Sequence, residues 1–276
     1  MLSKKILECN FSIGFVLLII KEPVLISVEN LVEGDIPTWI RRFVKQTGRG
    51  INRFKMINQG DTVLLGISGG KDSLALALAL SLRLKWLPIT YNLKAVMINW
   101  REYAIDAEET QKLKDFFTVL NIPFEIINAH MFPESFKNSF NCYLCSRNRR
   151  RILFEYAEKN NISKIALGHH LDDFTETSIM NLCFRGNFST MKPVQDFFKG
   201  KIYILRPMCE VKESVIQKLV KECDLPVSVF NCPHKDTNIR SKIKPIIKQL
   251  SHIDKLTREH IFAAHNFNDD LFVKND

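Results

Sequence analysis

The chain has 276 residues, of which 46% are hydrophobic and 25% charged, a balance that excludes a disordered chain and favours a globular protein with a sizeable core. The formal net charge of +9 favours a polyanionic partner, most simply a nucleic acid, although a basic surface without such a partner is the alternative. The seven cysteines are an odd number in a chain too large to need disulfide staples. We therefore expect a reduced, intracellular protein that uses thiolates as ligands or nucleophiles.

Residues 11–20 form an apolar run that follows two lysines and has the outline of a signal peptide. Residues 21–23, Lys-Glu-Pro, end the run at about ten residues, which is too short to span a bilayer. No small-residue cleavage site follows it, and we expect no transmembrane helix. The run is interpreted either as a strand or helix that caps the main domain or as a translation start placed too early.

Residues 30–60 form an amphipathic segment ahead of the main domain. Apolar residues at helical spacing make one stripe and basic residues lie outside it. These residues are Trp39, Ile40, Phe43 and Val44 in the stripe, and Arg41, Arg42 and Lys45 outside it.

From Asp61 onward, short apolar runs suited to buried strands alternate with helical patterns. The predicted strands are 63–67, 95–99, 124–127, 165–168 and 203–205, and the predicted helices between them are 72–85, 106–120, 147–160 and 172–184. This alternation predicts right-handed crossovers and a Rossmann-like α/β fold, with a parallel sheet covered by helices on both faces. Ligands of such sheets bind at the carboxyl ends of the strands.

Beyond Arg206-Pro207 the pattern predicts helices only. One helix runs to Cys223, an irregular stretch follows, and a second helix covers residues 235–250. The expected organisation has three parts: an N-terminal segment that packs on the core (1–60), a main α/β domain (61–210) and a C-terminal helical region (211–276).

The segment from Ser68 to Ser73, Ser-Gly-Gly-Lys-Asp-Ser, joins a predicted strand to a predicted helix and suits phosphate. The first turn of a helix has unpaired N–H donors at the positive end of its dipole. Gly69 and Gly70 let a ligand approach the backbone, and Lys71 adds a charge. The usual mononucleotide loop has four residues between its first glycine and the Gly-Lys pair, whereas these glycines and the lysine are contiguous. The alternative is a glycine turn that only lets the strand and helix pack.

Cys142 and Cys145 form a C-x-x-C pair at the start of a helix, where the helix terminus and the following arginines acidify thiols. A redox dithiol is one interpretation, but such pairs follow the first strand of a thioredoxin-like unit, and this pair follows the third. A structural zinc site needs four ligands, and Cys232 and His234 would complete it. An iron–sulfur cluster can be held by three thiolates, with Cys232 as the third and one iron left open.

Four of the residues 147–151 are arginines. A solvated helix face is the usual explanation for such a run. This run adjoins the cysteine pair and shares an edge of the sheet with the phosphate loop, so contacts from Arg149 and Arg150 to the phosphates of ATP or RNA are the second hypothesis.

The segment from Gly168 to Asp173 contains two adjacent carboxylates at the start of a helix that follows a strand. Asp172 and Asp173 suit Mg²⁺ that bridges ATP phosphates. The alternative is helix capping, in which Asp172 satisfies free N–H groups. Of His169 and His170, we expect one to be structural.

Taken together, these segments resemble the tRNA-cytidine 2-sulfurtransferases, the TtcA family of PP-loop ATP pyrophosphatases. The resemblance rests on residues 68–73, 142–150, 166–173, Arg206-Pro207 and Cys232, and it extends from about residue 60 to 250. It implies a cytoplasmic enzyme that takes ATP and Mg²⁺, carries a [4Fe–4S] cluster on three cysteines and converts a cytidine of the tRNA anticodon loop to 2-thiocytidine. It also implies tRNA and a sulfur donor such as a cysteine desulfurase as partners, a homodimer, and no membrane.

The resemblance assigns roles residue by residue. It implies cluster ligands at Cys142, Cys145 and Cys232, with Asp172 and Arg149 as further catalytic residues. The residues that it implies for ATP are Ser68, Gly69, Gly70, Lys71, Asp72, Ser73, Gly168 and Asp173. Two departures from the family pattern stand out: the second strand ends in Asn99-Trp100 without the usual acidic residue, and Lys235 replaces an optional cysteine.

Three other functions compete with this interpretation. A tRNA-lysidine synthetase also adenylates cytidine, but its chemistry has no use for three cysteines. The uridine-thiolating relatives with two zinc fingers carry extra cysteine pairs at their termini, which this chain lacks. A zinc-stabilised RNA-binding protein without catalysis would not need the phosphate loop.

Overall fold

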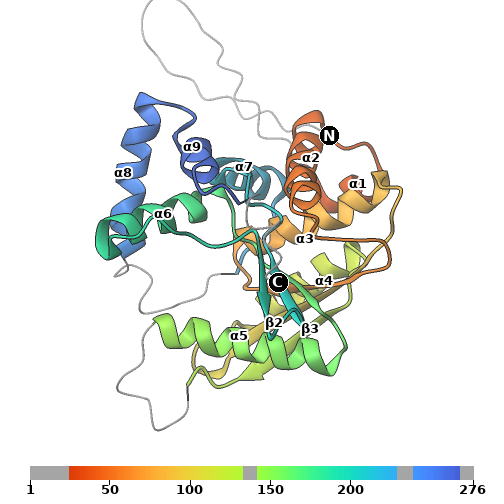
Figure 1. The fold of residues 1–276 in the computed structure, drawn as a ribbon. Helices are drawn as coiled ribbons and strands as arrows, with labels where there is room; N and C mark the ends of the chain where they lie inside the picture. Colours follow the sequence, from red (N-terminus) through yellow and green to blue (C-terminus); the bar gives the residue numbers. More distant parts are fainter. Residues whose placement is uncertain (1–24, 133–141, 229–238, 268–276) are drawn as a thin grey trace, which may run out of the picture.

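The computed structural model describes residues 25–132, 142–228 and 239–267 (Figure 1). The apolar N-terminal run, Cys232, His234 and the chain end therefore lie outside the described residues. Six strands form one sheet in the order β3-β2-β1-β4-β6-β5. The strands are β1 (Thr62–Ile67), β2 (Asn92–Trp100), β3 (Phe124–Ala129), β4 (Lys164–Ala166), β5 (Val194–Phe197) and β6 (Ile202–Leu205).

All strand pairs are parallel except β5 with β6, which form an antiparallel hairpin at one edge of the sheet. The five predicted strands and their parallel arrangement are confirmed. The sequence analysis missed β5, because Gln195 and Asp196 break its apolar pattern and because edge strands need only one buried face. The predicted α/β fold is otherwise the one observed.

The described helices cover both faces of this sheet. They are α1 (Val28–Glu33), α2 (Thr38–Arg53), α3 (Lys71–Arg83), α4 (Ala107–Val119), α5 (Cys142–Lys159), α6 (Leu171–Arg185), α7 (Glu213–Cys223), α8 (Ile239–Ile253) and α9 (Thr257–Ala263). α5 begins earlier than the predicted 147 and includes the first turn at Cys142. α9 was not predicted.

Strand β1 shows how the two layers arise from the sequence. Successive residues of a strand point to opposite faces. Val63, Leu65 and Ile67 join the core cluster beneath α2, α3, α4 and α7. Leu64 joins the second cluster, which Leu153 and Ala157 of α5 complete on the other face. Figure 1 shows α5 alone on its side of the sheet, apart from α2, α3 and α4.

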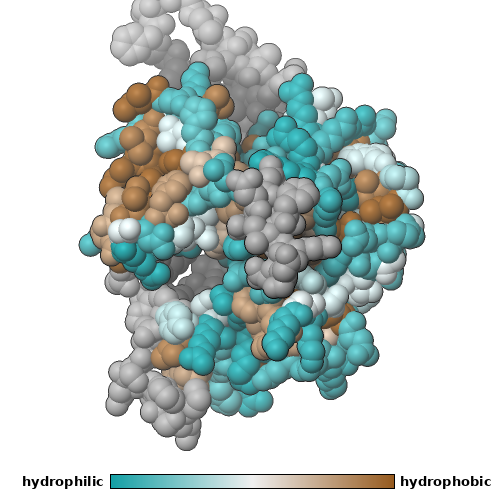
Figure 2. Space-filling view, viewed as in Figure 1, coloured by the Kyte–Doolittle hydropathy of each residue, from teal (hydrophilic) through white to brown (hydrophobic). Residues whose placement is uncertain are grey.

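Helices α6, α8 and α9 pack together beside the sheet. The rings of Phe174 on α6 and Phe262 on α9 meet edge to face, with their centroids 5.2 Å apart. In Figure 2 apolar side chains gather over α8. The exposed apolar residues of this helix are Ile239, Ile246, Leu250 and Ile253. None of the described helices is long and apolar enough to cross a membrane.

Phe43 on α2 tests whether the N-terminal segment is part of the cooperative unit. Its ring is 1% exposed and belongs to the same core cluster as the sheet. We expect Phe43→Ala to lower the free energy of unfolding by about 3–5 kcal/mol in a single transition, measured by urea denaturation. Lys45→Ala, at an exposed position of the same helix, is the control. A separate early transition in the variant would contradict a common unit.

Candidate active site

The phosphate loop follows β1 directly and ends at Gly70, the N-cap of α3. Gly69 has φ +78°, a left-handed conformation that favours glycine. The hydroxyl of Ser73 donates to the carbonyl of Gly70 (2.8 Å) and accepts from the N–H of Ser68 (3.3 Å). The N–H of Gly70 donates to the Ser68 hydroxyl (3.3 Å). These bonds shape the loop ahead of the first turn of α3, and helix N-termini of this kind suit anions.

Gly168, at the end of β4, lies against the first turn of α3. A Cβ atom at this position would lie 2.8 Å from the carbonyl carbon and oxygen of Asp72 and 2.9 Å from the amide nitrogen of Ser73. These neighbours are all backbone, so they cannot move aside independently. Gly168 therefore fixes how closely β4 approaches the phosphate loop.

A cavity of about 1070 Å³ opens at this edge of the sheet. The residues predicted for the site that line it are Ser68, Asp72, Ser73, Cys145, Arg149, Gly168 and Asp173. Residues from β1, α3, α5, β4 and α6 thus meet in one space, as the carboxyl ends of parallel strands require. Of the two predicted carboxylates after β4, the cavity receives only Asp173.

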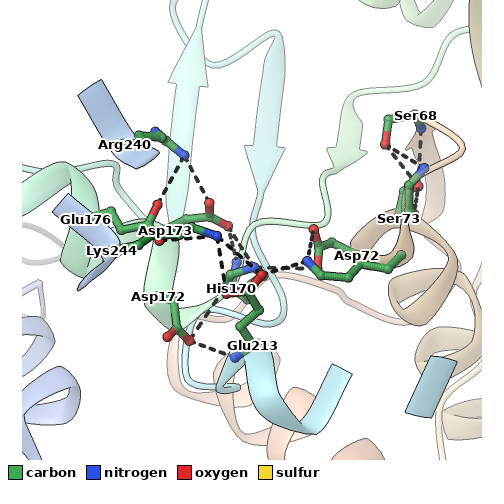
Figure 3. A network of polar contacts seen from close by, with 12 residues as sticks. Ser68, Asp72, Ser73, His170, Asp172, Asp173, Glu176, Glu213, Arg240 and Lys244 are labelled. Carbon is green, nitrogen blue, oxygen red and sulfur yellow. Dashed lines mark hydrogen bonds and ion pairs between the residues drawn. The ribbon is translucent and has the colours of Figure 1, made fainter. Parts of the chain in front are cut away.

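In Figure 3 Asp173 lies between His170 and Arg240, and Asp72 lies on the other side of His170, toward Ser73. The Oδ2 of Asp173 accepts from the N–H of His170 (3.0 Å), and its Oδ1 accepts from Arg240 (3.0 Å). Burial raises the pKa of this carboxyl, but His170, His169, the backbone N–H of His170 and Arg240 together lower it by more. Asp173 is therefore ionised.

Asp72 approaches the imidazole of His170 from the phosphate loop. His170 Nε2 lies 3.5 Å from Asp72 Oδ1 and 3.5 Å from Asp173 Oδ2. The two carboxylates therefore converge from α3 and α6. Oxygen donors of this kind are the ligands that Mg²⁺ prefers.

Asp172 does not line the cavity. Its Oδ2 accepts from the N–H of Glu213 at the start of α7 (2.7 Å), and its Oδ1 accepts from Arg258 of α9. Both oxygens are thus used to join α6 to two other helices. The structure favours a structural carboxylate, although the capping bond expected of Asp172 is made by Asp173.

The ammonium group of Lys71 contacts two carboxylates of the protein. It lies 2.8 Å from Asp72 and 3.0 Å from Glu213 of α7. Burial lowers the pKa of Lys71, but these two carboxylates raise it by more, so the group is charged. The lysine fixes α7 to the base of the phosphate loop.

Glu176 lies one turn beyond Asp173 on α6 and is almost fully buried. Its closest cations are Lys244 at 3.7 Å and Arg240 at 3.9 Å. Burial raises the pKa of Glu176 to about 7, against the opposing effect of Lys244. This carboxyl therefore titrates near neutral pH.

The cysteine pair occupies the first turn of α5. Cys142 begins the helix, and Cys145, half-buried, lines the cavity. Among the described residues no group of three His, Cys, Asp or Glu side chains forms a metal site, and Cys232 lies outside them.

Three further cationic or polar groups line the cavity: His169, Arg206 and Arg240. The sequence analysis named His169 and Arg206 without giving them a role in the site, and it did not name Arg240. Burial, reinforced by Arg206, lowers the pKa of His169 to about 4, so this imidazole is neutral, and its Nδ1 has no hydrogen-bond partner among the described residues. Burial lowers the pKa of Arg206 to about 10, so its guanidinium stays charged. The Arg206-Pro207 motif could have indicated a site role for Arg206, whereas nothing in the sequence indicated one for Arg240.

Three comparisons place this geometry among known proteins. A family model described as a PP-loop domain matches residues 41–230. A tRNA-cytidine(32) 2-sulfurtransferase of Bdellovibrio bacteriovorus is 32% identical over 227 residues, which are 81% of this chain and 86% of that protein. The enzyme of that name from Burkholderia ambifaria is 33% identical over 217 residues; the match covers 75% of this chain but only 62% of the relative.

A solved structure has a similar fold. It is described as the U34-tRNA thiolase NcsA from Methanococcus maripaludis with its [4Fe-4S] cluster. The TM-score is 0.70 at 21% identity, and the alignment covers 88% of this chain and 84% of that one.

Gly168→Ala tests the close approach of β4 to the phosphate loop. Because the new Cβ meets only backbone, we expect a loss of about 1–3 kcal/mol in the free energy of unfolding and weaker ATP binding by calorimetry. Gly48→Ala is the control, since its Cβ would meet only the Arg83 side chain, and alanine is favoured within a helix. Unchanged ATP affinity in Gly168→Ala would contradict the assigned constraint.

Glu176→Gln tests the buried carboxyl through the pH dependence of stability. The folded-state pKa of about 7 exceeds the ordinary glutamate pKa of 4.5, so between these values the folded protein holds a proton that the unfolded chain has lost. The free energy of unfolding then falls as pH rises through this window. As pH rises from about 5 to about 8, we expect the free energy of unfolding of the variant to increase relative to that of wild type by on the order of 2 kcal/mol, measured by urea denaturation.

Glu33→Gln, at an exposed position of α1, is the control and should follow wild type at both pH values. A difference between Glu176→Gln and wild type that stays constant with pH would show that Glu176 titrates normally.

Proposed function

This chain belongs to the tRNA-cytidine 2-sulfurtransferase family of PP-loop enzymes, and we propose that it uses ATP to replace the C2 oxygen of a tRNA cytidine with sulfur. The target that the relatives' name implies is cytidine 32. The observation that supports the proposal is the single cavity that brings the phosphate loop together with Cys145 and several arginines. A phosphate-binding loop and a thiol thus face the same space.

The chemistry explains why both are needed. The C2 carbonyl of cytosine is urea-like and a poor electrophile, and its oxygen is a poor leaving group. Transfer of AMP from ATP to that oxygen releases pyrophosphate and creates a good leaving group. Sulfur then attacks C2 and AMP departs.

The chain's own residues fit these steps. Ser68, Ser73 and the first-turn N–H groups of α3 bind the departing pyrophosphate. Arg149 and Arg206 line the same cavity and neutralise phosphate oxygens of ATP or RNA. Neutral His169 offers its unpartnered Nδ1 as a hydrogen-bonding group without adding charge.

The converging carboxylates of Asp72 and Asp173 suit Mg²⁺, which would neutralise charge on the phosphates of ATP. In this assignment Asp172 holds the helix that carries Asp173 and does not contact the ion.

The cysteines fit a [4Fe–4S] cluster on Cys142, Cys145 and Cys232. Held by these three thiolates, such a cluster would supply a place for the incoming sulfur. The described residues on either side of Cys232 contact the site. The N–H of Ser228 donates to the carbonyl of Gly69 (3.0 Å), and Arg240 pairs with Asp173.

The proposal includes a sulfur donor such as a cysteine desulfurase, a cytoplasmic location and a homodimer. The exposed apolar residues of α8 offer a second copy a surface.

Cys145→Ser and Cys232→Ser test the function. We expect both variants, purified anaerobically, to lose iron and acid-labile sulfide and to form no 2-thiocytidine in tRNA, measured by mass spectrometry of nucleosides. ATP affinity should stay near wild type, because the phosphate loop contains no cysteine. Cys183→Ser is the matched control, since this cysteine is exposed on α6 and does not line the cavity.

Wild-type rates of 2-thiocytidine formation in Cys232→Ser would overturn the cluster assignment. Stoichiometric zinc without iron in the wild-type protein, together with no thiolation, would favour a zinc-stabilised RNA-binding protein.

A further inference from the structure

A second cavity, of about 910 Å³, lies along the other flank of α5. It is bounded by α5 and by the loop of the β5–β6 hairpin, residues 198–201. The function proposed above makes no use of it. Its described lining combines aromatic rings with cations, chiefly Phe132, Phe154, Phe198, Arg147, Arg150 and Lys201.

The backbone at Phe198 is strained. Its φ is +56°, and the next two residues, Lys199 and Gly200, also have positive φ, at +58° and +81°. A bulky side chain in the left-handed region is an outlier, and such strain tends to persist at functional sites. The ring is also 59% exposed, so burial does not account for it. A strained and exposed aromatic residue at a hairpin tip points to a ligand.

The rings beneath Phe198 form a platform. Phe154 meets Phe198 with centroids 5.4 Å apart and an interplanar angle of 79°, and it meets Phe197 at 5.0 Å. The guanidinium of Arg150 lies 5.8 Å from the centre of the Phe197 ring. Aromatic rings and planar guanidinium groups are the surfaces on which unpaired nucleic-acid bases stack.

The charge of the cavity favours an anion. Four cations line it, at positions 147, 150, 151 and 201, against the carboxylates of Glu155 and Glu158. Arg151 is neutralised by Glu155 at 2.6 Å. Neither Lys199 nor Lys201 forms an ion pair with a described residue. The hairpin therefore presents lysines beside an aromatic ring, which suits a phosphate backbone beside a base.

The second cavity and the active-site cavity share Arg150 and Phe154. The two spaces thus adjoin along one ridge of α5. An RNA strand that lies in the second cavity can continue over this ridge toward the phosphate loop and Cys145.

We propose that the groove between α5 and the β5–β6 hairpin binds an unpaired nucleotide of the RNA substrate, next to the cytidine being modified, by stacking on Phe198 and Phe154 and by phosphate contacts from Lys201 and Arg147. This proposal rests on the function proposed above and adds the surface that holds the RNA. A protein partner or a small apolar molecule in the groove is the competing occupant.

Phe198→Ala is the direct test. The probe is an unmodified tRNA transcript, and binding is measured by fluorescence anisotropy without ATP. Since stacking on an aromatic side chain stabilises a base appreciably, we expect roughly five- to hundredfold weaker binding. Phe184→Ala is the matched control, because Phe184 is 60% exposed but lines neither cavity. It should bind tRNA as wild type does.

Thermal unfolding separates this role from a structural one. If Phe198 served only to pack the hairpin, Phe198→Gly would lower the melting temperature. Because glycine relieves the positive φ, we expect an unchanged or higher melting temperature together with weaker tRNA binding.

Lys201→Ala probes the phosphate contact through salt. We expect the slope of log affinity against log salt to become shallower by about 0.7–0.9 for one lost contact. Lys248→Ala, at an exposed position of α8, is the control and should leave this slope unchanged.

The outcomes distinguish this proposal from the function. If wild-type protein thiolates tRNA while Phe198→Ala and Lys201→Ala bind and thiolate it normally, the groove does not hold RNA, and the function stands. Slower transfer from a persulfide-bearing protein donor, with tRNA affinity unchanged, would assign the groove to that donor and overturn the proposal. Wild-type protein that binds tRNA through Phe198 but forms no 2-thiocytidine would support the groove and reject the function.

Discussion

The first turn of α3 lies so close to Gly168 that no side chain fits between them. This contact joins the ends of β1 and β4, the two neighbouring strands at the centre of the sheet. It sets the phosphate loop beside the start of α6, and so brings Asp72 and Asp173 to one imidazole. The carboxylates, the loop hydroxyls and the thiol of Cys145 can share a cavity only because these two backbones meet.

The charges behind the loop extend this constraint to the C-terminal helices. Lys71 pairs with Glu213 at the start of α7, and Lys244 of α8 also approaches Glu213, at 3.3 Å. These ion pairs are only partly buried, so they add little to the free energy of unfolding, but they hold the start of α7 against α3 and α8. The helices after residue 210 are therefore positioned by the same groups that surround the phosphate site. Glu176 belongs to the same group of charges, but because its pKa is raised to about 7, it is only partly ionised near neutral pH.

The sequence predicted what local patterns encode. Five strands were found because each is a short apolar run between polar segments, and the phosphate loop because its residues are contiguous. The choice between Asp172 and Asp173 was beyond reach, since adjacent residues on a helix point in directions about 100° apart and only the packing of α7 and α9 decides which one is used structurally. Arg240 was missed for a similar reason, as it comes from a helix far along the chain.

Helix α5 carries two working faces. Residues 145, 149 and 153 recur at helical spacing and line the active-site cavity, whereas residues 144, 147, 151, 155 and 158 recur in the same way and line the second cavity. Among the described side chains of this helix, Leu153 and Ala157 are fully buried in the core, and Ile152, Phe154 and Tyr156 pack against the same cluster while partly exposed. The polar groups on both flanks leave α5 only these apolar side chains as its anchor on the sheet. Arg150 and Phe154, on the ridge between the flanks, belong to both cavities.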